Sequence, residues 1–146
     1  MPSGTTIEGR ALLTGRAVGD AVVLDEPLSF WGGFDPHSGR IIDRRHPQTG
    51  SPVTGRILVM PSGRGSSSSS SVLAEAIRAG TGPEAIVLAE PDGILVLGAL
   101  VARELYGKEL PVLVLGPRDF SRIKWGDTVE IDGGVVTVMR RASNVN

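Results

Sequence analysis

The sequence predicts an α/β domain of three layers, β/β/α, built around a short parallel sheet. Three apolar runs, at residues 57–60, 85–88 and 112–115, have the length of buried strands. Residues 72–79 and 94–106 lie between them and carry apolar residues at helical spacing. A strand–helix–strand alternation implies right-handed parallel crossovers, so these strands should form one sheet.

Two further pairs of strands are predicted to flank this sheet as hairpins and to cover its other face. Residues 11–13 and 21–24 are apolar runs joined by a glycine-containing turn. In residues 127–138, apolar and polar residues alternate on both sides of an Asp-Gly-Gly turn, which is a strong hairpin signal. The helices should end at Gly80 and Gly107, because glycine is the commonest residue at helix C-caps.

Composition indicates an ordinary globular chain. Its 146 residues suit a single domain, with frayed ends expected at residues 1–8 and 141–146. A net charge of −1 gives no global attraction to nucleic acid or to an anionic membrane. The sequence has no cysteine, so any zinc or iron–sulfur cluster would need ligands from another chain. No apolar run resembles a signal peptide or a membrane span, and a cytoplasmic location is expected.

The loop after the first parallel strand is the main candidate for chemistry. Six serines follow a Gly-Arg-Gly turn, and a helix is expected to begin near Ser66. Backbone N–H groups and the positive end of a helix dipole would then meet at this point. Arg64 could grip a carboxylate or phosphate, and the hydroxyls of Ser62, Ser66 and Ser67 could donate to an anion or act as a base. The residues alone leave two alternatives open, because serine runs also form flexible linkers and helix caps.

Two charged residues are secondary candidates. Ligands of open parallel sheets bind beyond the carboxyl ends of the strands, so the loops after the three strands should converge. Glu90 and Arg118 follow the second and third strands. Each could equally be a simple helix-start charge.

Two other features allow competing interpretations. His37 and His46 lie nine residues apart with no third ligand nearby, which favours surface histidines over a metal pair. Trp31 and Phe34 flank a Gly-Gly pair. They form either a plug over the domain's own core or a contact surface for a ligand or partner.

Three stretches together resemble the small subunit, or swivelling domain, of the aconitase X family. They are LSFWGGFDP (28–36), GRILVMPSGRGS (55–66) and EPDGI (90–94), and the resemblance runs from Gly9 to the final hairpin. It implies an aconitase-like swivelling fold and a cytoplasmic hydro-lyase of two subunits. The large partner would hold an iron–sulfur cluster, and this chain, which binds no metal, would supply a serine base.

The resemblance also assigns roles to the serine loop. In the family's motif the serine base follows the Gly-x-Gly turn, which makes Ser66 the proton acceptor and Ser62 the runner-up. The other residues around this turn are expected to bind the substrate: Gly63, Arg64, Gly65 and Ser67. The expected helix start agrees with this assignment, since backbone N–H groups there would stabilise an alkoxide.

Members of the family act on two kinds of substrate. The serine run of residues 66–71 and the helix start at residues 90–98 resemble the dehydratases of cis-3-hydroxy-L-proline. The lack of a second basic residue beside Arg64 also disfavours 5-phosphomevalonate, the substrate of the other group. In two alternatives the chain has no catalytic role: it is an anion-binding swivelling module, or an interaction domain that uses Trp31 and Phe34 as its contact patch.

Overall fold

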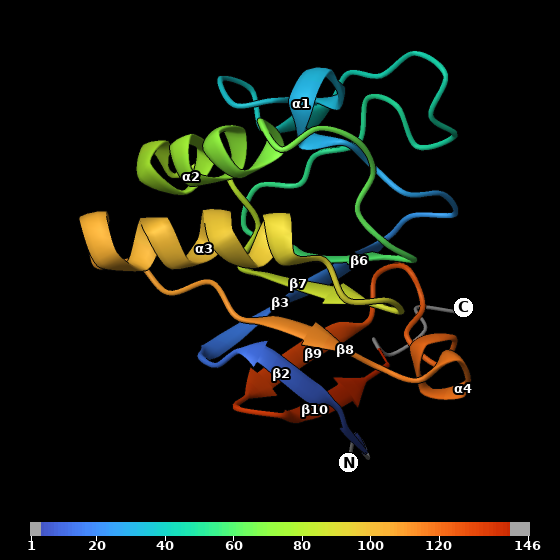
Figure 1. Cartoon of the computed structure of the whole chain (residues 1–146). Helices are drawn as coiled ribbons and strands as arrows, with labels where there is room; N and C mark the ends of the chain where they lie inside the picture. Colours follow the sequence, from blue (N-terminus) through green and yellow to red (C-terminus); the bar gives the residue numbers. More distant parts are fainter. Residues whose placement is uncertain (1–3, 141–146) are drawn as a thin grey trace.

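The computed structural model describes residues 4–140, which form an eight-stranded sheet, a two-stranded ribbon and four helices (Figure 1). The sheet has the strand order β1-β10-β9-β3-β6-β7-β8-β2, and β4 pairs with β5. The strands are β1 (Thr5–Glu8), β2 (Arg10–Leu13), β3 (Arg16–Val23), β4 (Phe34–Asp35), β5 (Arg40–Ile41), β6 (Ile57–Met60), β7 (Ala85–Leu88), β8 (Val112–Val114), β9 (Thr128–Asp132) and β10 (Val135–Met139). The helices are α1 (Phe30–Gly33), α2 (Ser69–Ala79), α3 (Gly93–Tyr106) and α4 (Pro117–Phe120).

The centre of the sheet is parallel, as the sequence predicts. Strand β6 pairs in parallel with β7, and β7 pairs in parallel with β8. Helices α2 and α3 lie together over one face of these strands (Figure 1). They approach closely at Gly98, where an added Cβ would lie 2.7 Å from the carbonyl oxygen of Ser70. Glycine at this position therefore sets how near the two helices can come.

Successive side chains of the parallel strands point to opposite faces of the sheet, and this produces the three layers. Leu58 and Met60 belong to the core beneath the helices, together with Leu73 of α2. The intervening Ile57 and Val59 belong to a second core on the other face. Residues of β1, β9 and β10 complete that second core: Ile7, Val129, Ile131, Val136 and Val138. The β/β/α fold class is thus confirmed.

The predicted N-terminal hairpin is wrong. Strands β2 and β3 follow each other directly but do not pair: β2 lies antiparallel to β8 at the far edge of the sheet. Strand β3 instead joins the two halves of the sheet. Its first part, from Arg16 to Asp20, pairs antiparallel with β9, and Ala21 to Val23 pair in parallel with β6. Each strand has a more distant partner, and these non-local pairings replace the local turn.

The C-terminal hairpin is present as predicted, with β9 antiparallel to β10. It gains a third strand, because Thr5–Glu8 forms β1 and pairs along its whole length with β10. The fraying expected for residues 1–8 is therefore wrong for β1. Residues 1–3 and 141–146 lie outside the described residues.

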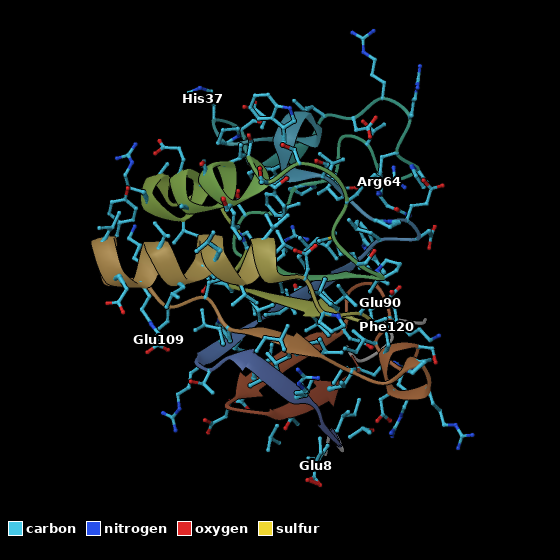
Figure 2. All side chains as sticks on the ribbon, in the orientation of Figure 1. Glu8, His37, Arg64, Glu90, Glu109 and Phe120 are labelled. Carbon is cyan, nitrogen blue, oxygen red and sulfur yellow. The ribbon has the colours of Figure 1, made fainter. Side chains whose placement is uncertain are left out.

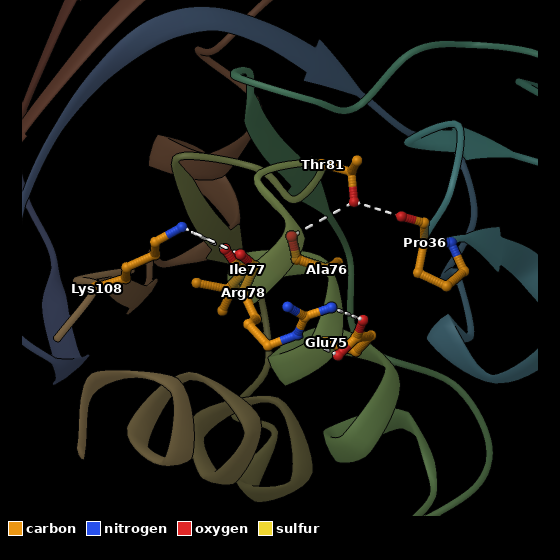
Figure 3. A network of polar contacts seen from close by, with 7 residues as sticks. All are labelled: Pro36, Glu75, Ala76, Ile77, Arg78, Thr81 and Lys108. Atoms are coloured by element: carbon orange, nitrogen blue, oxygen red, sulfur yellow. Dashed lines mark hydrogen bonds and ion pairs between the residues drawn. The ribbon is translucent and has the colours of Figure 1, made fainter. Parts of the chain in front are cut away.

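Both long helices end at the glycines that the sequence predicts as C-caps. Gly80 and Gly107 adopt left-handed conformations, with φ of 80° and 66°. Lys108 adds to the end of α2, because its Nζ donates to the carbonyl oxygens of Ile77 (3.3 Å) and Arg78 (3.2 Å) (Figure 3). A cation at this end of a helix offsets its partial negative charge. Among the described residues, no helix has both the length and the apolar character needed to cross a bilayer.

The long loop between β5 and β6 is ordered around a buried histidine. His46 is 3% exposed. Its Nε2 lies 3.1 Å from the carbonyl oxygen of Glu26, and its Nδ1 accepts a hydrogen bond from the backbone N–H of Gln48. The predicted surface location is therefore wrong for His46, while His37 is exposed as expected. The histidine has a structural role, because it ties this loop to the segment after β3.

Part of the aromatic stretch forms a plug over the core, and part of it lies at the surface. Phe34 is buried and packs against Phe30, with ring centroids 5.0 Å apart. Both rings belong to the core under the helices. Trp31 is 59% exposed. The plug is therefore made by the phenylalanines, and the tryptophan is left at the surface.

Candidate active site

The loop from β6 to α2 is an ordered turn and not a flexible linker. Helix α2 begins at Ser69, three residues later than expected, because a separate turn comes first. In this turn the N–H of Ser69 donates to the carbonyl oxygen of Ser66 (3.0 Å). The N–H of Ser68 donates to Ser66 Oγ (3.1 Å). Ser66 therefore caps the turn that leads into the helix.

Both glycines of the Gly-Arg-Gly turn are required by close contacts. Gly63 forms a parallel β-bridge with Leu28, and an added Cβ there would clash with Oδ2 of Asp92. Gly65 has φ of +101°, and its Cβ would lie 2.8 Å from Oγ of Ser29. A Cβ at either position would displace the neighbouring side chain, and Gly65 also has a left-handed backbone that favours glycine.

Ser69 fixes the other end of the loop. Its side chain is 3% exposed, and its Oγ accepts a hydrogen bond from the backbone N–H of Trp31 (3.1 Å). Ser29 Oγ in turn donates to the carbonyl oxygen of Trp31 (2.9 Å). The aromatic stretch and the serine loop are therefore one structural unit, and α1 lies over the N-terminal end of α2 (Figure 1).

Asp92 is a site residue that sequence reasoning missed. Its Oδ1 accepts hydrogen bonds from the N–H groups of Ile94 (2.9 Å) and Leu95 (3.1 Å), which makes it the N-cap of α3. Its other oxygen faces Gly63. Asp92 could have been predicted as an N-cap, because it stands just before a run of apolar residues at helical spacing. The turn 90–93 already pointed to the start of this helix.

These elements enclose a small hollow, which we call the Ser66 hollow. Its volume is about 20 Å³, enough for roughly one water molecule. Each of the three family-like stretches supplies part of its wall. It is lined by Leu28, Gly63, Arg64, Gly65, Ser66, Ser69, Asp92, Ile94 and Leu95. A substrate of several carbon atoms does not fit, so another surface would have to complete a substrate site here.

Arg64 is held loosely at the rim of this hollow. Its guanidinium lies 3.8 Å from Oε1 of Glu26, and both side chains are half exposed. An ion pair of this kind contributes little to stability, so Arg64 is free to turn towards an anion. Arg64 and Glu90 follow β6 and β7, Phe120 is the last residue of α4, and all three lie along one edge of the molecule (Figure 2). This is the edge where the parallel strands end.

The remaining candidates do not line the hollow. Ser62 and Ser67 flank it, and the carbonyl oxygen of Ser67 accepts a hydrogen bond from Ser70 Oγ (2.9 Å). The Glu90 loop adjoins the serine loop, because the N–H of Glu90 donates to the carbonyl oxygen of Pro61 (3.1 Å). Arg118 lies in α4, outside the lining. Of the three loops expected to converge, the first two meet at the hollow.

The chain's own residues do not fit an iron–sulfur cluster. Its sequence contains no cysteine to act as a thiolate ligand. Within residues 4–140, no group of three or more histidine, aspartate or glutamate side chains is placed to hold a metal ion.

The fold and this site define a swivelling domain of the aconitase type. The sequence profile of the aconitase X swivel domain matches residues 6–139, and the chain belongs to this family. It is 52% identical over 109 residues to a cis-3-hydroxy-L-proline dehydratase of Pseudomonas aeruginosa, covering 75% of this chain and 19% of that protein. It is 40% identical over 127 residues to the phosphomevalonate dehydratase small subunit of Pyrococcus furiosus, covering 87% of this chain and 89% of that subunit.

A solved structure gives the same result. The crystal structure of Thermococcus kodakaraensis aconitase X in its holo form superposes with a TM-score of 0.82 and 32% identity, over 92% of this chain and 98% of that chain. The relatives differ in length. This chain spans only 19% and 24% of two curated hydroxyproline dehydratases that it matches, but nearly all of the archaeal small subunit.

Proposed function

We propose that this chain, as a single swivelling domain over residues 1–146, is the small subunit of a cytoplasmic aconitase X-type hydro-lyase. The enzyme dehydrates cis-3-hydroxy-L-proline, and Ser66 is the proton acceptor. One observation carries the proposal: the Gly63–Ser66 turn is locked by contacts from both other family-like stretches, and this places Ser66 in the wall of the hollow.

The surroundings of Ser66 suit a base. A serine hydroxyl is too weakly acidic to act as one without help. The N–H of Ser68 donates to Ser66 Oγ, and this hydrogen bond strengthens as negative charge develops on the oxygen. The first turn of α2 begins three residues later and adds the positive end of a helix dipole. Ser62, the runner-up, is not part of the lining.

Dehydration of a 3-hydroxy acid removes a proton from the carbon beside the carboxylate and the hydroxyl from the next carbon. In this proposal Ser66 takes the proton, and Arg64 binds the carboxylate with help from the backbone of Gly63, Gly65 and Ser67. The leaving hydroxyl would depart as water on the side of the large partner, whose iron–sulfur cluster, held by cysteines that this chain lacks, would act as its Lewis acid.

Two observations favour the imino acid. The identity to the Pseudomonas hydroxyproline dehydratase is 52%, against 40% to the Pyrococcus small subunit. Arg64 is also the only basic residue in the lining, and its charge is shared with Glu26. One partly neutralised cation suits a single carboxylate better than a phosphate with up to two negative charges.

The second candidate is the small subunit of a phosphomevalonate dehydratase. The match in length favours it, because this chain covers 89% of the Pyrococcus small subunit and only 19% of the Pseudomonas protein. The positive end of the α2 dipole would also attract a phosphate.

Parallel assays separate the candidates. The chain is co-expressed with its large subunit, and turnover is measured on cis-3-hydroxy-L-proline and on 5-phosphomevalonate. We expect turnover of the imino acid only. Turnover of the phosphorylated acid alone would refute the substrate assignment. A non-catalytic module would bind small anions as an isolated chain, and Ser66→Ala would then change only that affinity.

A further inference from the structure

An exposed tryptophan stands beside the Ser66 hollow on a rigid base. Trp31 is 59% exposed, and the rings of Phe30 and Phe34 on either side of it in the chain are buried. Both polar groups of the Trp31 backbone are bonded: its N–H donates to Ser69 Oγ and its carbonyl oxygen accepts from Ser29 Oγ. The backbone that carries the indole is therefore fixed, and one hydrogen bond joins it to Ser69, which lines the hollow.

The neighbouring loop extends this surface. The N–H of Ile42 donates to the carbonyl oxygen of Gly33 (2.8 Å), and the side chain of Ile42 is 49% exposed. Arg44 and Arg45 follow on the same turn and are exposed, and within residues 4–140 neither guanidinium has a hydrogen-bond or ion-pair partner. Trp31, Ile42, Arg44 and Arg45 form what we call the Trp31 patch. Its side chains come from two segments that are joined by the Ile42–Gly33 hydrogen bond: one carries the indole, and the other carries an isoleucine and two cations.

The hollow itself indicates what covers this patch. It holds about one water molecule, so a second surface must lie across it to complete a substrate site. The backbone N–H of Trp31 donates to Ser69 Oγ, so a surface that covers the hollow lies next to the Trp31 segment. This chain spans only 19% of the Pseudomonas relative, so most of such an enzyme lies outside it.

We infer that the Trp31 patch docks the large subunit of the hydro-lyase, whose facing surface offers an apolar pocket for the indole bordered by carboxylates. This inference rests on the proposed function. An exposed tryptophan on a fixed backbone is the type of residue that dominates binding energy at interfaces. The two exposed arginines of the neighbouring segment would steer the encounter and select an acidic partner surface.

The chain provides a matched control, because its only other tryptophan, Trp125, is 51% exposed and lies between α4 and β9. Affinity for the large subunit is measured by calorimetry, without substrate, for Trp31→Ala and Trp125→Ala. We expect Trp31→Ala to weaken binding tenfold or more and Trp125→Ala to leave it within about twofold. Equal effects of the two variants would overturn the inference.

A second measurement uses the unmutated chain and does not depend on how a variant folds. This chain alone is labelled with 5-fluorotryptophan and mixed with unlabelled large subunit. We expect the fluorine resonance of Trp31 to shift in the complex and that of Trp125 to stay in place. An unshifted Trp31 resonance, or one that shifts with the concentration of this chain alone, would overturn the inference. The second result would indicate self-association.

The two proposals can fail separately. Binding is measured without turnover, so it does not depend on the reaction catalysed. If the subunits bind through Trp31 but dehydrate neither substrate, the docking surface is supported and the dehydratase proposal is refuted. If the reconstituted pair dehydrates the imino acid and Trp31→Ala binds normally, the docking surface is refuted and the proposed function stands.

Discussion

Replacing Gly65 with alanine should test how tightly the serine loop is built. Two costs are expected. The left-handed backbone, with φ of +101°, disfavours any residue with a Cβ by about 1–2 kcal/mol. The new Cβ would lie 2.8 Å from Ser29 Oγ, and moving that oxygen breaks its bond to Trp31, which costs about 0.5–1.5 kcal/mol. The total loss of unfolding free energy is then about 1.5–3.5 kcal/mol.

Gly50 is the matched control. Its φ is +89°, but an added Cβ there has no neighbour within 4 Å. Gly50→Ala should therefore show the backbone cost alone, and any change in the unfolded chain is common to both variants. Urea unfolding followed by circular dichroism gives both free energies. In a Ser29→Ala background, where only the Cβ of residue 29 remains 3.3 Å from the new methyl group, the cost of Gly65→Ala should fall towards that of Gly50→Ala.

Equal costs of Gly65→Ala and Gly50→Ala in the unmutated chain would refute the argument. That result would mean that Ser29 does not press against the turn. The locked position of Ser66, on which the proposed function depends, would then lose its main support.

Three further predictions concern α3 and the β4–β5 ribbon. Gly98→Ala should lower the unfolding free energy by about 1–3 kcal/mol, because the methyl group meets the Ser70 backbone, whereas Gly93→Ala, with open space around it, should not destabilise the fold. Asp92→Ala should lower the unfolding free energy by about 1 kcal/mol through loss of the N-cap, and Asp92→Asn should keep most of the stabilisation that the cap provides. Equal losses for the two variants in urea unfolding would contradict the role of Asp92 as a cap. A hydrogen bond from the backbone N–H at residue 37 holds the pKa of Asp35 below its ordinary value, so this carboxylate stabilises the fold above about pH 4 and the effect is lost as pH falls through the folded-state pKa. Asp35→Asn should therefore lower the melting temperature at pH 7, and the difference should shrink towards pH 2; a difference that stays constant would contradict this.

Features set by local chemistry could be predicted from the sequence. The ends of α2 and α3 follow from Gly80 and Gly107, because a left-handed glycine closes a helix wherever its neighbours lie. The parallel strands follow from short apolar runs between helical segments. The core of the site was also local, since Gly63 to Ser66 are consecutive residues in one loop.

What the sequence could not reveal depends on distant partners. Strand β2 turns away from β3 because it pairs with β8, about a hundred residues later. His46 is buried because the carbonyl oxygen of Glu26 lies beside it, and no local pattern encodes that contact. Asp92 joins the site only because its free oxygen faces Gly63. The start of α2 moved from Ser66 to Ser69 because Ser66 caps a separate turn first.

The most direct test of the central claim is the turnover of cis-3-hydroxy-L-proline by the Ser66→Ala variant, reconstituted with the large subunit. Ser71→Ala is the control, because Ser71 is an exposed serine of the same run, in α2. If Ser66 is the base, Ser66→Ala should lower kcat by about 10²–10⁴-fold while binding to the large subunit is unchanged. Ser71→Ala should keep full activity. A Ser66→Ala enzyme that turns over as fast as the Ser71→Ala enzyme would contradict the account.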